Sequence, residues 1–166
     1  MTENELFFAA KEAVKTLENH KKTLALAESC TGGLVSKLIT DVSGASAVYE
    51  GGVCSYSNSV KMKILGVKEE TLRTFGAVSE NTAREMSQGV RKALGADIGV
   101  GITGIAGPLS DGTNKPVGLI YISVCSEKFE KTVELKNNFT ENVREQNRLS
   151  AAKTALDLIS EDELYE

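Results

Sequence analysis

The sequence has 166 residues, 41% of them hydrophobic and 25% charged, with a formal net charge of −4. This length and balance are typical of one soluble globular domain with a substantial core, so we expect a single domain over residues 1–166. The negative net charge does not favour direct binding to nucleic acid. No apolar stretch is long enough to cross a bilayer.

The N-terminus and the cysteines restrict the cellular setting. The first residues lack the basic and then apolar layout of a secretory signal, so we expect a cytoplasmic protein. The three cysteines, Cys30, Cys54 and Cys125, are an odd number without a Cys-x-x-Cys pair. A disulfide framework and a structural metal site are therefore not expected.

In chain order, the apolar periodicity first predicts a helix that begins with a capping box of Thr2 and Glu5 and ends at His20. Strands and helices then alternate as far as Gly95, and Ser79 caps the last helix of this part. The predicted elements are a strand at 23–27, a helix at 32–40, a strand at 47–56, short helices at 58–65 and 69–74, and a helix at 80–94.

The rest of the chain has a different order. Residues 97–103, 117–124 and 131–135 have the pattern of strands with no helix between them, and the last two should pair as a hairpin. A final helix begins near Glu141, and the acidic tail at 161–166 is predicted to be frayed. This order predicts an α/β fold with a mixed, mostly parallel sheet and helices on both faces.

Three unusual stretches follow predicted strands directly. They lie at residues 28–33, 56–61 and 103–108. Ligands of such sheets bind beyond the carboxyl ends of the parallel strands, so the sequence predicts a site where these stretches share one edge.

Ser29 lies between a strand and a helix, a position that presents a side chain beside unpaired backbone N–H groups. It is a candidate nucleophile, and the alternative is that Ser29 or Thr31 only caps the helix. Cys30 is either a rival nucleophile or, as we favour, a small buried residue. His20 is the only histidine and is expected at the opposite edge of the sheet, so a Ser-His-Asp triad is not expected.

A serine without a histidine needs another base, and Lys61 follows a strand end by about one helical turn. Burial would lower the pKa of its amine, whereas the alternative is a solvated surface lysine. Tyr56 is placed to relay a proton or to hold the lysine. Thr103, Gly104 and the glycine that follows offer backbone donors for an oxyanion or a phosphate, and loop 109–115 is either a lid or a plain connection.

Several spaced motifs together resemble those of the CinA C-terminal domain family. They read Ala-Glu-Ser-Cys-Thr-Gly-Gly at 27–33, Tyr-Ser-Asn-x-x-Lys at 56–61, Gly-Ala-Val-Ser at 76–79, Thr-Gly-Ile-Ala-Gly-Pro at 103–108 and Lys-Pro-Val-Gly at 115–118. The resemblance runs from about residue 5 to residue 158. It implies a three-layer α/β/α sandwich on a five-stranded mixed sheet. It also implies hydrolysis of the carboxamide of nicotinamide mononucleotide to nicotinic acid mononucleotide and ammonia, a step of pyridine nucleotide recycling that needs no metal or organic cofactor.

The resemblance also implies roles for individual residues. Ser29 would be the nucleophile, Lys61 its base and Tyr56 a positioning partner, with a serine ester as the intermediate. Backbone donors at 31–33 and 103–104 would hold the oxyanion or the nucleotide phosphate. The substrate-binding residues that follow from the resemblance are Glu28, Thr31, Gly32, Gly33, Thr103, Gly104, Gly107 and Arg144.

Two features depart from the family pattern. Many relatives have Gly-Asp-Arg before the last helix, where this chain has Asn-Phe-Thr at 138–140, so Arg144 and Arg148 are the nearby cations. The sequence also lacks the amino-terminal pyrophosphatase domain of full-length CinA proteins. The alternative to an enzyme is a non-catalytic protein of competence or DNA-damage responses that acts through a protein partner. Dimers are frequent in the family, so the resemblance also implies a homodimer.

Overall fold

The computed structural model describes residues 1–166, and six α-helices surround one five-stranded sheet. The helices are α1 (Glu3–His20), α2 (Leu34–Thr40), α3 (Asn58–Leu65), α4 (Glu69–Phe75), α5 (Glu80–Leu94) and α6 (Val143–Ile159). The strands are β1 (Leu24–Glu28), β2 (Tyr49–Cys54), β3 (Ile98–Gly104), β4 (Leu119–Cys125) and β5 (Glu130–Lys136). Two 3-10 helices, η1 (Ala45–Ala47) and η2 (Asp162–Tyr165), complete the structure.

The sheet has the order β2-β1-β3-β4-β5. Strand β1 is parallel to both β2 and β3, while β4 is antiparallel to both β3 and β5. Only β4 is therefore reversed, and the predicted mixed, mostly parallel sheet is confirmed. Strand β1 lies between β2 and β3, and all three run in the same direction. Their carboxyl ends therefore meet at one edge of the sheet, which is where ligands of such sheets bind.

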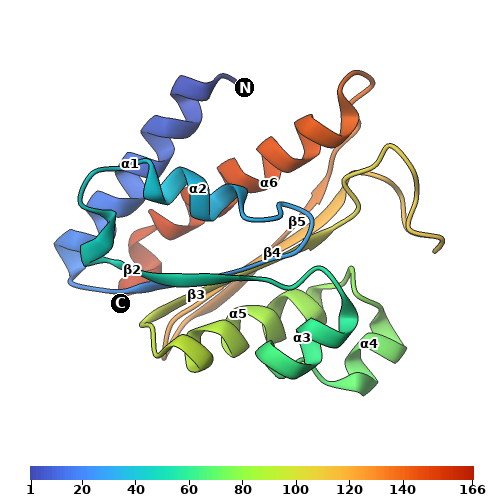
Figure 1. Ribbon diagram of the computed structural model, residues 1–166, viewed down its shortest axis with the longest axis horizontal. Coiled ribbons are helices and arrows are strands. Elements are labelled where there is room, and N and C mark those ends of the chain that lie inside the picture. The colour runs from blue at the N-terminus through green and yellow to red at the C-terminus, as the bar shows by residue number, and fades with distance from the viewer.

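The helices form two layers, one on each face of the sheet. Figure 1 shows α1, α2 and α6 on one face and α3, α4 and α5 on the other, which confirms the three-layer α/β/α sandwich. The larger apolar cluster, with 28 buried residues, fills the space under α1, α2 and α6. A smaller cluster of 7 buried residues lies under α5.

Two glycines in β3 explain why α5 lies so close to the sheet. A Cβ atom at Gly99 would lie 2.1 Å from the backbone oxygen of Ser87, and one at Gly101 would lie 2.4 Å from that of Ala83. Neither distance is compatible with a side chain, so these positions require glycine for the approach of α5.

Most of the predicted boundaries are confirmed. Thr2 and Glu5 form the capping box of α1, and Ser79 and Gly95 cap the two ends of α5. Strand β2 is shorter than its prediction and α6 begins two residues later, at Val143, because Asn142 adopts a left-handed conformation. These differences stay within the usual uncertainty of element ends.

The prediction of a frayed tail is wrong. The tail forms η2, in which Leu164 is only 1% exposed. The ring of Tyr165 stacks on that of His20 with 4.2 Å between centroids, and its hydroxyl donates to the Ile159 oxygen at 2.6 Å. Leu164 and Tyr165 therefore dock the acidic tail onto α1 and α6. The contact with Tyr165 also holds the His20 ring at this end of the molecule, away from Ser29.

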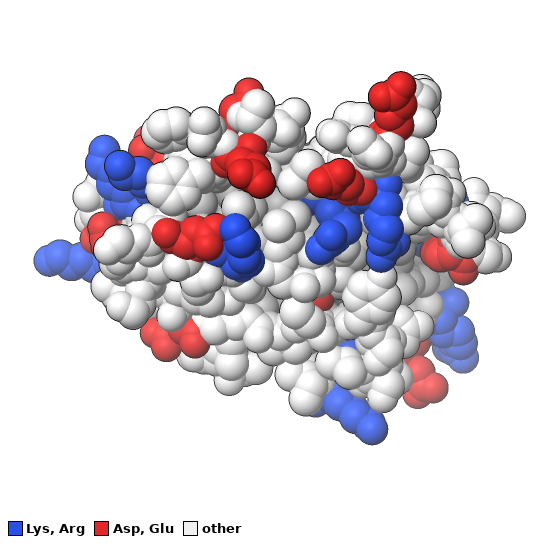
Figure 2. Space-filling view, turned by 45° about the horizontal axis from the view of Figure 1, so that its top comes forward, with Lys and Arg blue, Asp and Glu red and all other residues white.

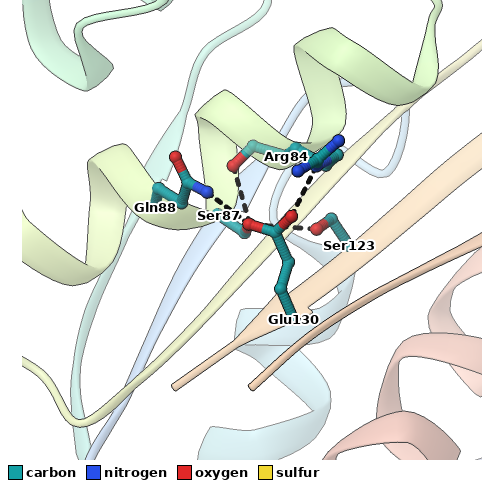
Figure 3. A network of polar contacts seen from close by, with 5 residues as sticks. All are labelled: Arg84, Ser87, Gln88, Ser123 and Glu130. Carbon is teal, nitrogen blue, oxygen red and sulfur yellow. Dashed lines mark hydrogen bonds and ion pairs between the residues drawn. The ribbon is translucent and has the colours of Figure 1, made fainter. Parts of the chain in front are cut away.

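A polar network joins α5 to the two strands at the β5 edge (Figure 3). The carboxylate of Glu130 accepts hydrogen bonds from Arg84, at 2.5 Å, and from Gln88. Nearby, the hydroxyl of Ser87 donates to the Ser123 oxygen at 3.0 Å. The network links α5 to β4 through Ser123 and to β5 through Glu130.

The surface carries both signs of charge. In Figure 2, acidic and basic side chains are interspersed over the face shown, and basic ones also lie beside each other in a hollow of this face. None of the helices combines the length and the apolar character that crossing a bilayer would need.

Candidate active site

A cleft of about 240 Å³ opens at the edge of the sheet where β1, β2 and β3 end. All three of the stretches that the sequence singled out contribute to it, together with residues 77–78 and the first turn of α6. The residues that line the cleft are Ser29, Cys30, Tyr56, Lys61, Ala77, Val78, Thr103, Gly104, Ile105, Ala106, Gly107, Leu109, Asp111 and Arg144.

Ser29 is held at the base of this cleft by its own backbone. Its N–H donates to the Ile102 oxygen of β3 at 3.0 Å, and its carbonyl accepts from the Gly32 N–H at 3.0 Å. The side chain does not cap α2, because the residue at that position is Gly33. The capping alternative therefore does not hold for Ser29, whose hydroxyl remains free for another contact.

The Ser29 hydroxyl contacts the amine of Lys61, with 3.1 Å between Oγ and Nζ. Lys61 is only 1% exposed, although it lies on a helix near the molecular surface. Burial lowers the pKa of this amine to about 8, because an apolar environment disfavours the charged form. No carboxylate forms a salt bridge with it. The surface-lysine alternative is therefore excluded.

Two backbone carbonyls orient the Lys61 amine. The nitrogen lies 2.5 Å from the oxygen of Ser55 and 3.3 Å from that of Tyr56. The charged amine donates to all three neighbours, the two carbonyls and the Ser29 hydroxyl. When the amine is neutral and its two hydrogens stay on the carbonyls, its lone pair is left for the Ser29 hydroxyl, which is the geometry that a general base requires.

The Tyr56 phenol does not take part in this arrangement. The side chain is 62% exposed at the mouth of the cleft, and its hydroxyl accepts a hydrogen bond from Arg144 at 2.9 Å. Only the backbone carbonyl of Tyr56 contacts Lys61, so the prediction that the phenol relays a proton or holds the lysine is corrected. The shorter contact comes from Ser55, which the sequence reasoning missed. Its contribution is a backbone carbonyl, which every residue type has, so the sequence cannot indicate it.

Cys30 is a buried thiol and not a rival nucleophile. Burial, and secondarily the nearby charge of Glu28, raises its pKa to about 12, so the thiol keeps its proton. The side chain is 5% exposed and belongs to the larger apolar cluster. The interpretation of Cys30 as a small buried residue is confirmed.

Glu28 and the two glycines serve the turn itself, which corrects their prediction as substrate-binding residues. The Glu28 carboxylate is 1% exposed and accepts from the N–H groups of Gly33, Val35 and Ser36 at 2.8–3.1 Å. It also accepts from the Ser36 hydroxyl at 2.7 Å. An acidic side chain is stabilised at a helix start in this way. The Gly33 N–H is thus bound to Glu28, and the Gly32 N–H is bound to the Ser29 carbonyl.

The first turns of α6 hold the neighbouring loops through their carbonyl groups. Arg148 donates to the oxygens of Cys30, at 3.2 Å, and Thr31, at 2.8 Å. Asn147 donates to the Ala106 oxygen at 2.9 Å, and Arg144 donates to the Gly107 oxygen at 2.9 Å. Asn147 was missed and Arg148 was named only as a nearby cation, although polar residues at 144, 147 and 148 share one helix face and this spacing is visible in the sequence.

The carbonyl contacts leave a set of backbone donors free. In a trans peptide the N–H points away from the carbonyl of the same unit. The N–H groups of Cys30, Thr31, Ala106 and Gly107 have no acceptor within the chain. The free backbone donors of these two loops are therefore at 30–31 and 106–107, and of the predicted donors at 31–33 only Thr31 retains a free N–H.

The remaining predicted residues differ in their surroundings. The Thr103 hydroxyl donates to the Ala77 oxygen at 2.7 Å, and Gly104 lies against β4, where a Cβ would be 2.6 Å from the Ile120 side chain. The Thr31 side chain is buried, and its hydroxyl has no partner. Thr103 and Gly104 line the cleft as predicted, but as parts of its wall.

Comparison with known proteins agrees with this architecture. The family model described as the CinA C-terminal domain matches residues 7–162. A CinA-like protein of Syntrophomonas wolfei is 52% identical over 143 residues, which are 86% of this chain and 34% of that protein. A putative competence-damage inducible protein of Thermoanaerobacter sp. is 48% identical over 146 residues, 88% of this chain and 35% of that protein. The chain thus spans about a third of the length of these curated relatives.

Solved structures share the fold closely. The competence/damage inducible protein CihA from Agrobacterium tumefaciens is 35% identical and superimposes with a TM-score of 0.88, covering 93% of both chains. The competence damage-inducible protein A from Klebsiella pneumoniae is 30% identical with a TM-score of 0.88, covering 95% of this chain and 96% of that one.

Proposed function

The chain belongs to the CinA C-terminal domain family, and we propose that it is an amidohydrolase that hydrolyses the carboxamide of nicotinamide mononucleotide. The observation that carries this proposal is the 3.1 Å contact between the Ser29 hydroxyl and the Lys61 amine. The lowered pKa of Lys61 supports it, because about a tenth of the amine is then neutral at pH 7, far more than for an ordinary lysine.

The reaction begins when Ser29 Oγ attacks the carboxamide carbon and its proton passes to Lys61 Nζ. The N–H groups of Cys30 and Thr31 are the nearest free donors along the chain for the negative charge that develops on the carboxamide oxygen. The C–N bond then breaks, Lys61 returns the proton to the departing nitrogen, and ammonia leaves.

A serine ester remains and water completes the turnover. Lys61 takes a proton from the water as its oxygen attacks the ester carbon. The Ser29–carbonyl bond breaks, and the same proton returns to Ser29 Oγ. The products are the pyridine carboxylic acid and the free enzyme, and no cofactor enters the balance.

The lining of the cleft supports a substrate with both signs of charge. Nicotinamide mononucleotide has a cationic ring and an anionic phosphate. Tyr56 presents an exposed aromatic ring and Asp111 a carboxylate, both of which suit a cation, whereas Arg144 suits a phosphate. Arg144 is the arginine that lines this cleft.

The test is ammonia release from nicotinamide mononucleotide by the wild type and by Ser29→Ala. We expect turnover by the wild type and a loss of about a thousandfold or more in the variant, as for other removed nucleophiles. Ser59→Ala is the matched control, because Ser59 is exposed at the start of α3 and does not line the cleft. Equal turnover in wild type and Ser29→Ala would exclude Ser29 as the nucleophile.

A second candidate function follows from the printed name of relatives such as the putative competence-damage inducible protein of Thermoanaerobacter. It is a non-catalytic role in competence or DNA-damage responses through a protein partner. The two functions separate in the same experiment. Absence of ammonia release from the wild type, together with binding of a recombination protein, would favour the second.

A further inference from the structure

Lys115 connects the loop at 109–115 with the segment that follows α4. It ends the loop at 109–115, whose residues Leu109 and Asp111 line the cleft. Its amine donates to the oxygen of Phe75 at 2.5 Å and to that of Val78. No acidic side chain pairs with it, so the position of this half-buried ammonium is set by two backbone carbonyls.

The segment that Lys115 binds has all of its carbonyl groups occupied. The Gly76 oxygen accepts from the hydroxyls of Ser79, at 3.1 Å, and Thr82, at 2.7 Å. The Ala77 oxygen accepts from Thr103 at 2.7 Å. Residues 76–79 form neither helix nor strand, so these contacts replace the hydrogen bonds of regular structure.

The same contacts leave backbone donors free in the cleft wall. The N–H groups of Ala77 and Val78 have no acceptor in the chain, and both residues line the cleft that contains Ser29. Each N–H points away from the carbonyl of its own planar peptide unit, that is, away from the oxygens of Gly76 and Ala77 that are held inside the protein. The two donors therefore have a fixed direction.

The local sequence is adapted to this contact. Gly76 has a φ angle of +81°, and a Cβ there would lie 3.2 Å from the Lys115 amine. Glycine at this position both allows the left-handed backbone and leaves room for the amine.

We propose that Lys115 is a positioning residue of the active site: by binding the Phe75 and Val78 carbonyls, which flank the two peptide units just described, it holds in place the segment whose Ala77 and Val78 N–H groups form a second set of donors for an oxygen of the substrate. This inference rests on the proposed amidohydrolase function. Lys115 itself contacts no reacting atom, and the donors that it positions belong to two residues that line the cleft.

The test compares Lys115→Met, Lys115→Arg and the control Lys128→Met, which removes an exposed lysine far from the cleft. With nicotinamide mononucleotide, we expect Lys115→Met to raise KM by about tenfold and to lower kcat by less, because a binding contact is lost. Lys115→Arg also offers several donors and should recover activity to within about threefold of the wild type. The control should behave as the wild type.

Labelling of Ser29 separates positioning from general damage. A small sulfonyl fluoride that reacts with the Ser29–Lys61 pair does not reach across the cleft, so its labelling rate should stay within about twofold of the wild type in Lys115→Met. A labelling rate that falls in parallel with turnover would mean a collapse of the whole site and would overturn the proposal. Unchanged KM and kcat in Lys115→Met would overturn it too.

Hydrogen exchange gives a readout that needs no substrate. The N–H of Gly76 is bonded to the Leu72 oxygen and that of Gly118 to the Ile105 oxygen, next to the two ends of the Lys115 bridge. Loss of the bridge should speed exchange of both amides by about fivefold or more, with no change in the middle of α5. If the wild type is labelled at Ser29 but releases no ammonia, the proposed substrate is wrong. The exchange rates then still decide the role of Lys115, and unchanged rates refute it.

Discussion

The floor and the rim of the cleft are built in different ways. The floor consists of Ser29 and Lys61, which are 9% and 1% exposed, and of the Ser55 carbonyl. The rim consists of Tyr56, Leu109, Asp111 and Arg144, and two of its side chains, Tyr56 and Leu109, are 62% and 83% exposed. In the floor, side chains are held by backbone groups of the sheet edge, whereas Tyr56 and Arg144 at the rim hold each other.

This difference separates chemistry from recognition. A proton transfer needs an amine whose pKa is lowered and whose lone pair is directed, and only burial against fixed carbonyls provides both. Recognition of a substrate tolerates exposed side chains, because each contact adds only a small part of the binding free energy. Substitutions in the floor should therefore change the rate, and substitutions at the rim should change mainly the affinity.

The largest effect is expected for Lys61→Met, which keeps the linear side chain but removes the base. We expect kcat for ammonia release to fall by about a thousandfold, within the range usual for removal of a general base, while KM changes by about threefold or less. Steady-state kinetics and calorimetric binding of the product acid measure the two quantities.

Lys63→Met is the matched control for this variant. Lys63 lies two positions further along α3, and its side chain is exposed and forms no hydrogen bond, so its replacement should leave both constants unchanged. Retention of most of the turnover in Lys61→Met would mean that another group takes the proton of Ser29, and the distinction between floor and rim would lose its basis.

The pH profile of the wild type should show the next largest effect. Lys61 has a pKa of about 8, so kcat/KM should reach half of its maximum near that pH and level off above it. Below pH 8 it should fall by about tenfold per pH unit, because only the neutral amine accepts a proton. A profile that is flat between pH 6 and 9 would contradict Lys61 as the base.

The same pKa makes stability depend on pH. Above about pH 8 the folded protein releases the Lys61 proton, while the unfolded chain retains it up to the ordinary lysine pKa of about 10.4. The unfolded state then binds more protons, so the free energy of unfolding rises with pH in this interval. Denaturant unfolding between pH 7 and 10 should show that the free energy of unfolding of the wild type rises relative to that of Lys61→Met, since the other titrating groups are common to both proteins.

The fold could be predicted from the sequence because its signals are local. The limits of α3 and α5 follow from capping residues such as Ser79 and Gly95, and the order of strands follows from apolar runs. The tail was predicted wrongly because its docking depends on the contact of Tyr165 with His20, which lie at opposite ends of the chain. Tertiary contacts of this kind leave no local pattern.

The site could be predicted only in part for the same reason. The pairing of Ser29 with Lys61 follows from two strand ends that share an edge, and the structure brings the two side chains together. The group that holds Lys61 is a backbone carbonyl of Ser55, and every residue has such a group. Glu28 was assigned to the substrate because a motif shows which residues occur together but not which way a carboxylate points.

The smallest effect is expected for Tyr56→Phe, and it distinguishes the structure most sharply from the sequence prediction. If the phenol relayed a proton, its removal would lower kcat by orders of magnitude. Because only the backbone carbonyl of Tyr56 contacts Lys61, we expect kcat to stay within about threefold of the wild type. The lost hydrogen bond from Arg144 should raise KM by a similar factor, since a single exposed contact is worth about 1 kcal/mol or less. Steady-state kinetics of ammonia release measures both. Tyr56→Ala, which also removes the exposed ring, should raise KM further without a larger loss of kcat. A fall of kcat by orders of magnitude in Tyr56→Phe would mean that the phenol takes part in the chemistry of the floor.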